Sequence, residues 1–102
     1  MLAKARKAAG MLKALSHEGR LLILCLLADG ERSVSEIETI MDMPQAAVSQ
    51  QLAVLRRERI VTARRDAQTM FYRIVREDIG QLLVFLNDTY CGDAAHKQEK
   101  NQ

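Results

Sequence analysis

The chain has 102 residues, a size that suits a single domain, and its formal net charge at neutral pH is only +2. The longest apolar run, residues 21–27, is far too short to cross a bilayer, and the two cysteines form neither a Cys-x-x-Cys pair nor a disulfide framework. These totals exclude a membrane-spanning protein and a disulfide-stabilised secreted scaffold. We expect no signal peptide and a cytoplasmic location.

Charge is distributed unevenly along the chain. Residues 29–42 carry five acidic side chains and one arginine, whereas residues 56–76 carry seven arginines and two acidic side chains. Arginine binds phosphates and base edges through a planar group with five donors. The same basic block is equally typical of a solvated surface. The helices and strands that contain these arginines must therefore distinguish nucleic-acid binding from simple solvent exposure.

Helices are expected to dominate because proline occurs once and glycine is sparse. Residues 2–15 predict a basic, alanine-rich helix. Ser16 is expected to cap a second helix, with residues 20–28 as its body, and Asp29-Gly30 is a stop signal.

Two further helices follow in the acidic and central parts of the chain. Ser33 and Glu36 have the spacing of a capping box, which predicts a third helix that ends near Met41. Pro44 fits the first turn of a fourth helix. In that helix, residues at i, i+4 and i+7 share an inward face: Val48, Leu52 and Leu55.

From residue 60 the apolar period changes to that of a strand. Residues 60–65 and 69–75 predict two strands around a turn at 66–68. A last helix over about residues 77–90 carries one apolar face, and Cys91-Gly92 ends it; the face comprises Ile79, Leu82, Leu83, Leu86 and Tyr90. The predicted fold is mainly α with a small β-hairpin, a winged helix-turn-helix of order α-α-α-α-β-β-α. We expect one domain over residues 1–92 and a flexible polar tail over 93–102.

The fourth helix and the hairpin together favour DNA binding, because a helix can enter the major groove, where base edges distinguish all four pairs. Four residues opposite the inward face are predicted to approach the bases: Gln45, Ala46, Ser49 and Gln50. At the end of this helix, the phosphate backbone is the predicted partner of Arg56 and Arg57. The hairpin is predicted to lie along the backbone or in the minor groove through Arg64, Arg65 and Gln68.

Three segments resemble the ArsR/SmtB family of small dimeric bacterial repressors: "LSHEGRLLIL", "VSQQLAVLRRERIV" and "RRDAQTMFYRI". The resemblance covers residues 12–91, although the family commonly has His at the position of Gln51. It implies a homodimer built from the first and last helices that binds an imperfect palindrome in operator DNA. An inducer then lowers the affinity for DNA.

Many members of this family sense metal ions, but this chain lacks their ligand patterns. The third helix has no cysteine pair, and the only histidine near the last helix is His96, in the tail. Transition-metal sites need His or Cys side chains at spacings that converge. We therefore expect no metal and no other cofactor.

The two cysteines match one branch of the family, the persulfide-responsive repressors of the BigR/SqrR type. That likeness implies a redox switch in which a persulfide or polysulfide links Cys25 to Cys91 through a bridge of several sulfur atoms. From the residues alone, Cys25 in "LLILCLL" is also typical of a packing residue, and we expect this stretch to bury it.

Three other functions compete with a sulfur-sensing repressor. A thiol enzyme is not expected, because the chain lacks Cys-x-x-Cys, a spaced catalytic partner and a cofactor loop. A repressor whose inducer is a metal ion or haem near Cys91, Tyr90 or His17 remains open. So does a winged-helix domain that mediates only protein contacts.

Overall fold

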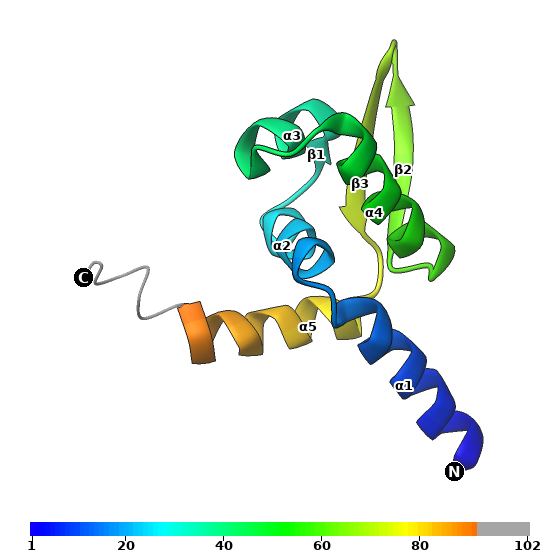
Figure 1. The fold of residues 1–102 in the computed structure, drawn as a ribbon. Helices are drawn as coiled ribbons and strands as arrows, with labels where there is room; N and C mark the ends of the chain where they lie inside the picture. Colours follow the sequence, from blue (N-terminus) through cyan, green and yellow to red (C-terminus); the bar gives the residue numbers. More distant parts are fainter. Residues whose placement is uncertain (92–102) are drawn as a thin grey trace.

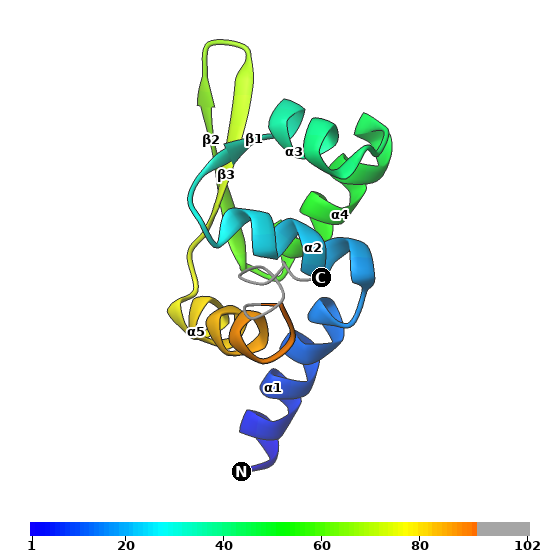
Figure 2. The same ribbon diagram turned by 90° about the vertical axis from the view of Figure 1, so that its left-hand side faces the viewer.

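The structure is a computed structural model that describes residues 1–91. Five helices, three strands and a π-helical turn follow in this order: α1 (Leu2–Leu15), α2 (Glu18–Leu27), β1 (Arg32–Ser33), α3 (Val34–Met41), α4 (Gln45–Arg57), β2 (Val61–Asp66), β3 (Thr69–Ile74), α5 (Glu77–Leu86) and η1 (Asn87–Cys91). In Figures 1 and 2, α2 lies between α5 and α3, the hairpin extends from the body, and α1 projects away from it. The predicted winged helix-turn-helix order is confirmed.

A third strand, which the sequence did not predict, joins the hairpin. Strand β1 pairs antiparallel with β3, so that Arg32 lies opposite Tyr72 and Ser33 opposite Phe71. Its two residues are too few to show a strand period. The pairing fixes the start of α3 against the wing, because Ser33 belongs to β1 and also caps α3.

The core lies where α2, α3, α4 and α5 meet the base of the sheet. The three predicted inward residues of α4 are fully buried, and further apolar side chains pack around them: Ile23, Leu24, Leu27, Ile37, Ile60, Val61, Ile79 and Leu83. The predicted capping box is also confirmed. The Glu36 N–H donates to the Ser33 hydroxyl at 3.1 Å, and the Ser33 N–H donates to the Glu36 carboxylate at 2.8 Å.

The cap of α2 differs from the prediction. His17 takes the cap position, and its Nδ1 accepts the N–H groups of Gly19 at 3.1 Å and Arg20 at 3.3 Å. The Ser16 hydroxyl instead donates to the Lys13 carbonyl at 2.8 Å, so this carbonyl in the last turn of α1 has a hydrogen-bond partner. The end of α1 leaves carbonyl groups without helical partners, and the start of α2 leaves N–H groups without them. Ser16 donates to one such carbonyl, and His17 accepts from two such N–H groups.

The last helix also departs from its predicted shape. It is α-helical only to Leu86 and then widens into η1, and Tyr90 is 74% exposed rather than part of the buried face. A π-helical turn holds more residues per turn, so the side chains that follow rotate off the original face. The predicted domain end at residue 92 and the predicted tail at 93–102 lie outside the described residues. No helix within residues 1–91 is long and apolar enough to span a membrane.

Candidate nucleic-acid interface and cysteine site

The residues predicted to contact DNA bases lie on the outer face of α4, which we call the reading helix. All four are exposed and lie in the first half of this helix: Gln45, Ala46, Ser49 and Gln50. The helical period separates this polar face from the buried one formed by Val48, Leu52 and Leu55. The first turn of α4 contains no acidic residue, so its positive dipole end carries no charge that would repel phosphate.

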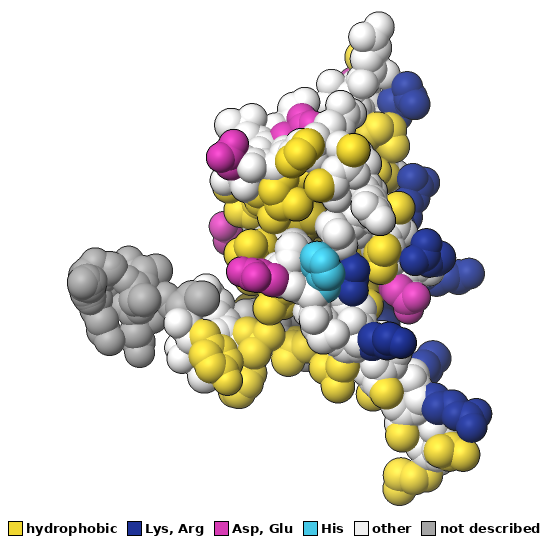
Figure 3. Space-filling view, in the orientation of Figure 1, with side chains coloured by type: hydrophobic (Ala, Val, Ile, Leu, Met, Phe, Trp, Pro, Cys, Tyr) yellow, Lys and Arg dark blue, Asp and Glu magenta, His cyan; other side chains and the backbone are white. Residues whose placement is uncertain are grey.

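Basic side chains gather along one edge of the molecule. In Figure 3, Lys and Arg follow this edge over the wing, the end of α4 and α1, whereas acidic groups lie mostly over the other side. Arg56 and Arg57 are exposed in the last turn of α4 and contribute to this edge. The edge therefore combines a polar helix face with a row of cations.

The two predicted wing arginines differ in their surroundings. Arg64 donates from Nε and Nη2 to the Glu31 carboxylate at 2.8 and 2.7 Å, and its guanidinium lies 4.6 Å from the centre of the Phe71 ring. This hydrogen bond from Arg64 holds the pKa of Glu31 below its ordinary value. Arg65 projects from the other face of β2 and is exposed, as is Gln68 in the turn.

A hydrogen-bonded link that the sequence reasoning missed connects three helices. Arg20 donates from Nε to the Ala14 carbonyl at 2.6 Å and from Nη1 to the Gln51 amide oxygen at 3.0 Å. It thus joins the end of α1 and the body of α2 to the reading helix α4. The signal in the sequence was a charged residue at the start of an otherwise apolar helix.

Cys25 is exposed in the single chain, which corrects the prediction that its apolar neighbours bury it. The residues of α2 that enter the core are Ile23, Leu24 and Leu27, and Cys25 lies on the flank that they leave outside. Every residue of "LLILCLL" is apolar, so no polar–apolar alternation marked which face would turn inward.

Two cavities meet at Cys25. One, of about 660 Å³, is an apolar hollow between α2 and the end of α3, with Leu22, Ile40 and Met43 among its lining residues. The other, of about 270 Å³, lies between α2 and α5 and is lined by Cys25, Ala28, Asp29, Leu83, Val84 and Asn87. Because η1 continues α5 from Asn87, Cys91 follows only four residues after a residue that shares this cavity with Cys25.

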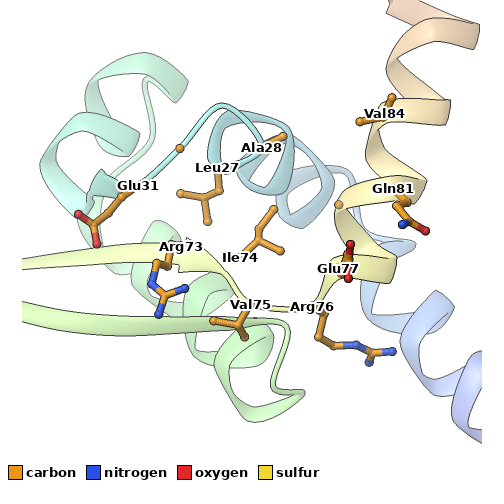
Figure 4. Close-up of a pocket in the computed structure, with 12 residues that line it drawn as sticks. Leu27, Ala28, Glu31, Arg73, Ile74, Val75, Arg76, Glu77, Gln81 and Val84 are labelled. Carbon is orange, nitrogen blue, oxygen red and sulfur yellow. The ribbon is translucent and has the colours of Figure 1, made fainter.

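A third cavity, of about 620 Å³, lies at the base of the wing (Figure 4). Leu27 of α2 and Ile74 of β3 project toward each other, while Glu77 and Gln81 come from α5. Charged groups on its border include Glu31 and Arg73. No sequence pattern predicts this cavity, because segments far apart in the chain line it.

No group of three or more His, Cys, Asp or Glu side chains within residues 1–91 is arranged to hold a metal ion. His17 borders the same apolar hollow as Cys25, and its Nδ1 already accepts two backbone hydrogen bonds. Tyr90 is exposed in η1. His96, the other histidine of the chain, lies outside the described residues.

Comparison with known proteins identifies the family. Residues 17–63 match the bacterial regulatory protein family called arsR. The transcriptional activator HlyU of Vibrio cholerae is 42% identical over 85 residues, which are 83% of this chain and 79% of HlyU.

Solved structures of similar proteins share the fold. The transcriptional repressor BigR from Xylella fastidiosa has a TM-score of 0.83 and 41% identity, covering 89% of this chain and 93% of that one. A homodimeric winged helix-turn-helix DNA-binding domain, Mb0332 from Mycobacterium bovis, has a TM-score of 0.78 and 33% identity, covering 99% and 92%. HlyU and BigR are transcriptional regulators, which confirms the expectation that this chain is not an enzyme. The chain belongs to the arsR family of bacterial regulatory proteins, and it is a winged helix-turn-helix, DNA-binding regulator of transcription.

Proposed function

We propose that this protein is a homodimeric repressor that binds an imperfect palindrome in operator DNA and leaves it when a persulfide or polysulfide links Cys25 to Cys91. The similarity to the repressor BigR supports repression, and the similarity to the homodimeric Mb0332 domain supports a dimer. The observation that carries the sensing part is the cavity that Cys25 shares with the end of α5.

The apolar surface of the single chain supports a dimer through α1 and α5. Helix α1 buries only Ala14 and Leu15, both at its end, and leaves Leu2 and Leu12 66% and 53% exposed. On α5, Phe85 is 61% exposed. Side chains of this size gain about 1.5–3 kcal/mol each on full burial, so pairing with a second copy is favourable.

In a symmetric dimer the two α4 helices enter successive major grooves. A twofold arrangement of helix-turn-helix units requires half-sites about 34–36 Å apart, one turn of DNA, which is why the operator is expected to be a palindrome. Ser49 and Gln50 then read base edges, while the arginines of the wing and of the end of α4 hold phosphates.

The proposed switch is a balanced sulfur transfer. Each cysteine thiolate attacks the terminal sulfur of a persulfide RSSH, forms a new S–S bond and releases RS⁻, so that both become cysteine persulfides. The terminal sulfur of one then attacks the cysteine sulfur of the other and expels HS⁻, which leaves a trisulfide. The two cysteines are oxidised, and the donor sulfur that departs as HS⁻ is reduced. A longer polysulfide donor yields a longer bridge.

A bridge between α2 and η1 is coupled to the reading helix through contacts already described. Helix α2 holds α4 through the hydrogen bond from Arg20 to Gln51, and α5 belongs to the proposed dimer surface. Tying α2 to η1 therefore changes how α4 is held relative to its copy. A coupling free energy of about 1–3 kcal/mol changes affinity roughly 5- to 150-fold, which is enough for regulation.

The decisive experiment is mass spectrometry after treatment with inorganic polysulfide, together with DNA binding. We expect an intramolecular crosslink between the Cys25 and Cys91 peptides with added sulfur mass, and release of the operator duplex. Cys25→Ser and Cys91→Ser should each bind the operator as tightly as the wild type, yet stay bound after treatment. Normal release of either variant would refute the dithiol switch.

A separate titration tests the alternative inducers. Titration of the reduced protein with Zn²⁺ or haem should leave both the absorption spectrum and the operator affinity unchanged. A change that His17→Ala abolishes and Cys25→Ser preserves would favour a metal or haem regulator instead.

A further inference from the structure

The first helix carries cations that its own stability does not explain. Lys4, Arg6 and Lys7 lie in the first two turns of α1, where no acidic residue and no side-chain cap offsets the helix dipole. Positive charge near a helix N-terminus is unfavourable, because the N-terminal end of the dipole is itself positive. Lys13, in contrast, lies in the last turn, where a cation is favourable.

These three side chains also have no anionic partner within the described part of the chain that would explain them. The three ion pairs within residues 1–91 involve Arg64 with Glu31 and Asp66, and Arg76 with Asp78. Lys4, Arg6 and Lys7 are exposed on the segment of α1 that projects from the body. Their charges are therefore available to an anionic partner.

The helical period places the lysines and the apolar residues of α1 on different faces. Leu2, Ala5, Ala9 and Leu12 follow i, i+3, i+7 and i+10 and form one exposed stripe. Lys4 and Lys7 fall in line with Met11 and Ala14, which turn toward the body. A second copy seated on the apolar stripe leaves both lysines uncovered.

Cations of α1 continue the basic edge that runs over the wing and the end of α4 (Figure 3). Figure 3 shows cations from the wing, past the end of α4, and onward over α1. A polyanion that lies on α4 and the wing and follows this edge meets α1 next. Double-stranded DNA has this shape and charge, with one phosphate charge for about every 1.7 Å of its axis.

We infer that α1 is a second DNA-contacting element, in which Lys4 and Lys7 bind phosphates next to the segment that α4 reads. This inference rests on the proposed binding of duplex DNA by a dimer. Phosphate contacts carry no sequence information, so α1 adds affinity and orientation rather than specificity. Because α1 also belongs to the proposed dimer surface, a change in that surface alters these contacts directly.

The test is the salt dependence of DNA binding by the intact protein. Each phosphate contact contributes about 0.9 to the slope of log affinity against log salt concentration. Lys4→Gln/Lys7→Gln removes two lysines per protomer, so the slope should fall by about 2 to 4. Affinity at low salt should fall roughly 10- to 100-fold, equally for operator and random duplex.

Two control variants separate this contact from other effects. Lys4→Arg/Lys7→Arg keeps the charge and should retain the wild-type slope. Arg76→Gln removes a cation that pairs with Asp78 and should also retain it. Sedimentation at the same concentrations checks that every variant is a dimer. If Lys4→Gln/Lys7→Gln is an intact dimer and its salt-dependence slope equals that of the wild type, the inference is overturned.

A measurement on the wild type keeps the inference testable if the Gln variant loses its dimer. Acetylation of Lys4 and Lys7 by a water-soluble ester should slow several-fold when duplex DNA saturates the protein, and unchanged rates overturn the inference. Failure of the proposed function looks different, since the wild type would then not prefer a palindromic operator to random duplex at any salt concentration.

Discussion

Helices α4 and α5 have similar apolar patterns but different surroundings in the single chain. The inward residues of α4, such as Leu52, have no exposed surface, and the face opposite to them is polar. Helix α5 buries Ile79 and Leu83 on one side but leaves Val84 and Phe85 about 60% exposed on another. The apolar face of α4 is thus fully covered within one chain, whereas α5 keeps exposed apolar side chains on a second side.

This difference indicates that α4 and α5 have different roles, DNA reading and assembly. A helix that reads DNA needs a rigid buried face and a polar outer face, and α4 has both. A helix that is apolar on several sides must be covered by more than its own chain supplies. The contrast between α4 and α5 therefore predicts that mutations on the buried face of α4 act on folding, whereas mutations on the outside of α5 act on assembly.

The largest effect is expected from Leu52→Ala, which empties a fully buried position beneath the reading face. The free energy of unfolding should fall by about 2–5 kcal/mol, because both burial and packing are lost. Urea denaturation measures it. Leu22→Ala, at a position 49% exposed on α2, is the matched control and should cost less than about 1 kcal/mol. Equal losses for the two variants would contradict the core described above.

The next effect is expected from Phe85→Asp, which places a charge on the outer side of α5. The dimer should dissociate at roughly 100-fold higher concentration, or about 2.7 kcal/mol, while the helical content of the monomer stays unchanged. Sedimentation measures the dissociation of the dimer, and circular dichroism measures the helical content. Gln81→Glu adds a charge to the same helix beside the wing cavity, and this control should remain a dimer. Wild-type dimerisation of Phe85→Asp would remove α5 from the interface.

The smallest effect concerns the two wing arginines. Arg65→Gln should weaken operator binding by about 1 kcal/mol, and Arg64→Gln by less, because Arg64 is already engaged by Glu31. Fluorescence anisotropy with labelled operator measures both. The opposite order would show that Arg64 leaves Glu31 to bind DNA.

The pH dependence of this pair follows from the pKa of Glu31, which Arg64 lowers in the folded chain. A carboxyl with a lowered folded pKa stabilises the fold above its unfolded pKa, and the contribution is lost as the pH falls through the folded value. The link between β1 and the wing is therefore intact at neutral pH and weakens only in acid.

Much of the reading half could be predicted because its signals are local. The spacing of Val48, Leu52 and Leu55 marks one helix face, and Ser33 with Glu36 marks a helix start within four residues. The proposed contacts of Gln45, Ala46, Ser49 and Gln50 with bases remain predictions, although the exposure of these residues agrees with that role.

The remaining features depend on residues that are distant in the chain. Glu31 holds Arg64, and Arg20 holds Gln51, across about thirty residues each. A two-residue strand and a histidine cap have no periodic signal of their own. Sequence patterns therefore did not distinguish Arg64, which Glu31 binds, from its neighbour Arg65.

The sequence by itself determined the order of helices and strands, the buried face of α4 and the arginine-rich block, because each follows from period, capping or composition within a short window. Only the tertiary structure decided that Cys25 lies outside the core, beside the end of α5. The reason is that "LLILCLL" is apolar on every side, so the face that is buried depends on the neighbours that pack against α2 and not on α2 itself.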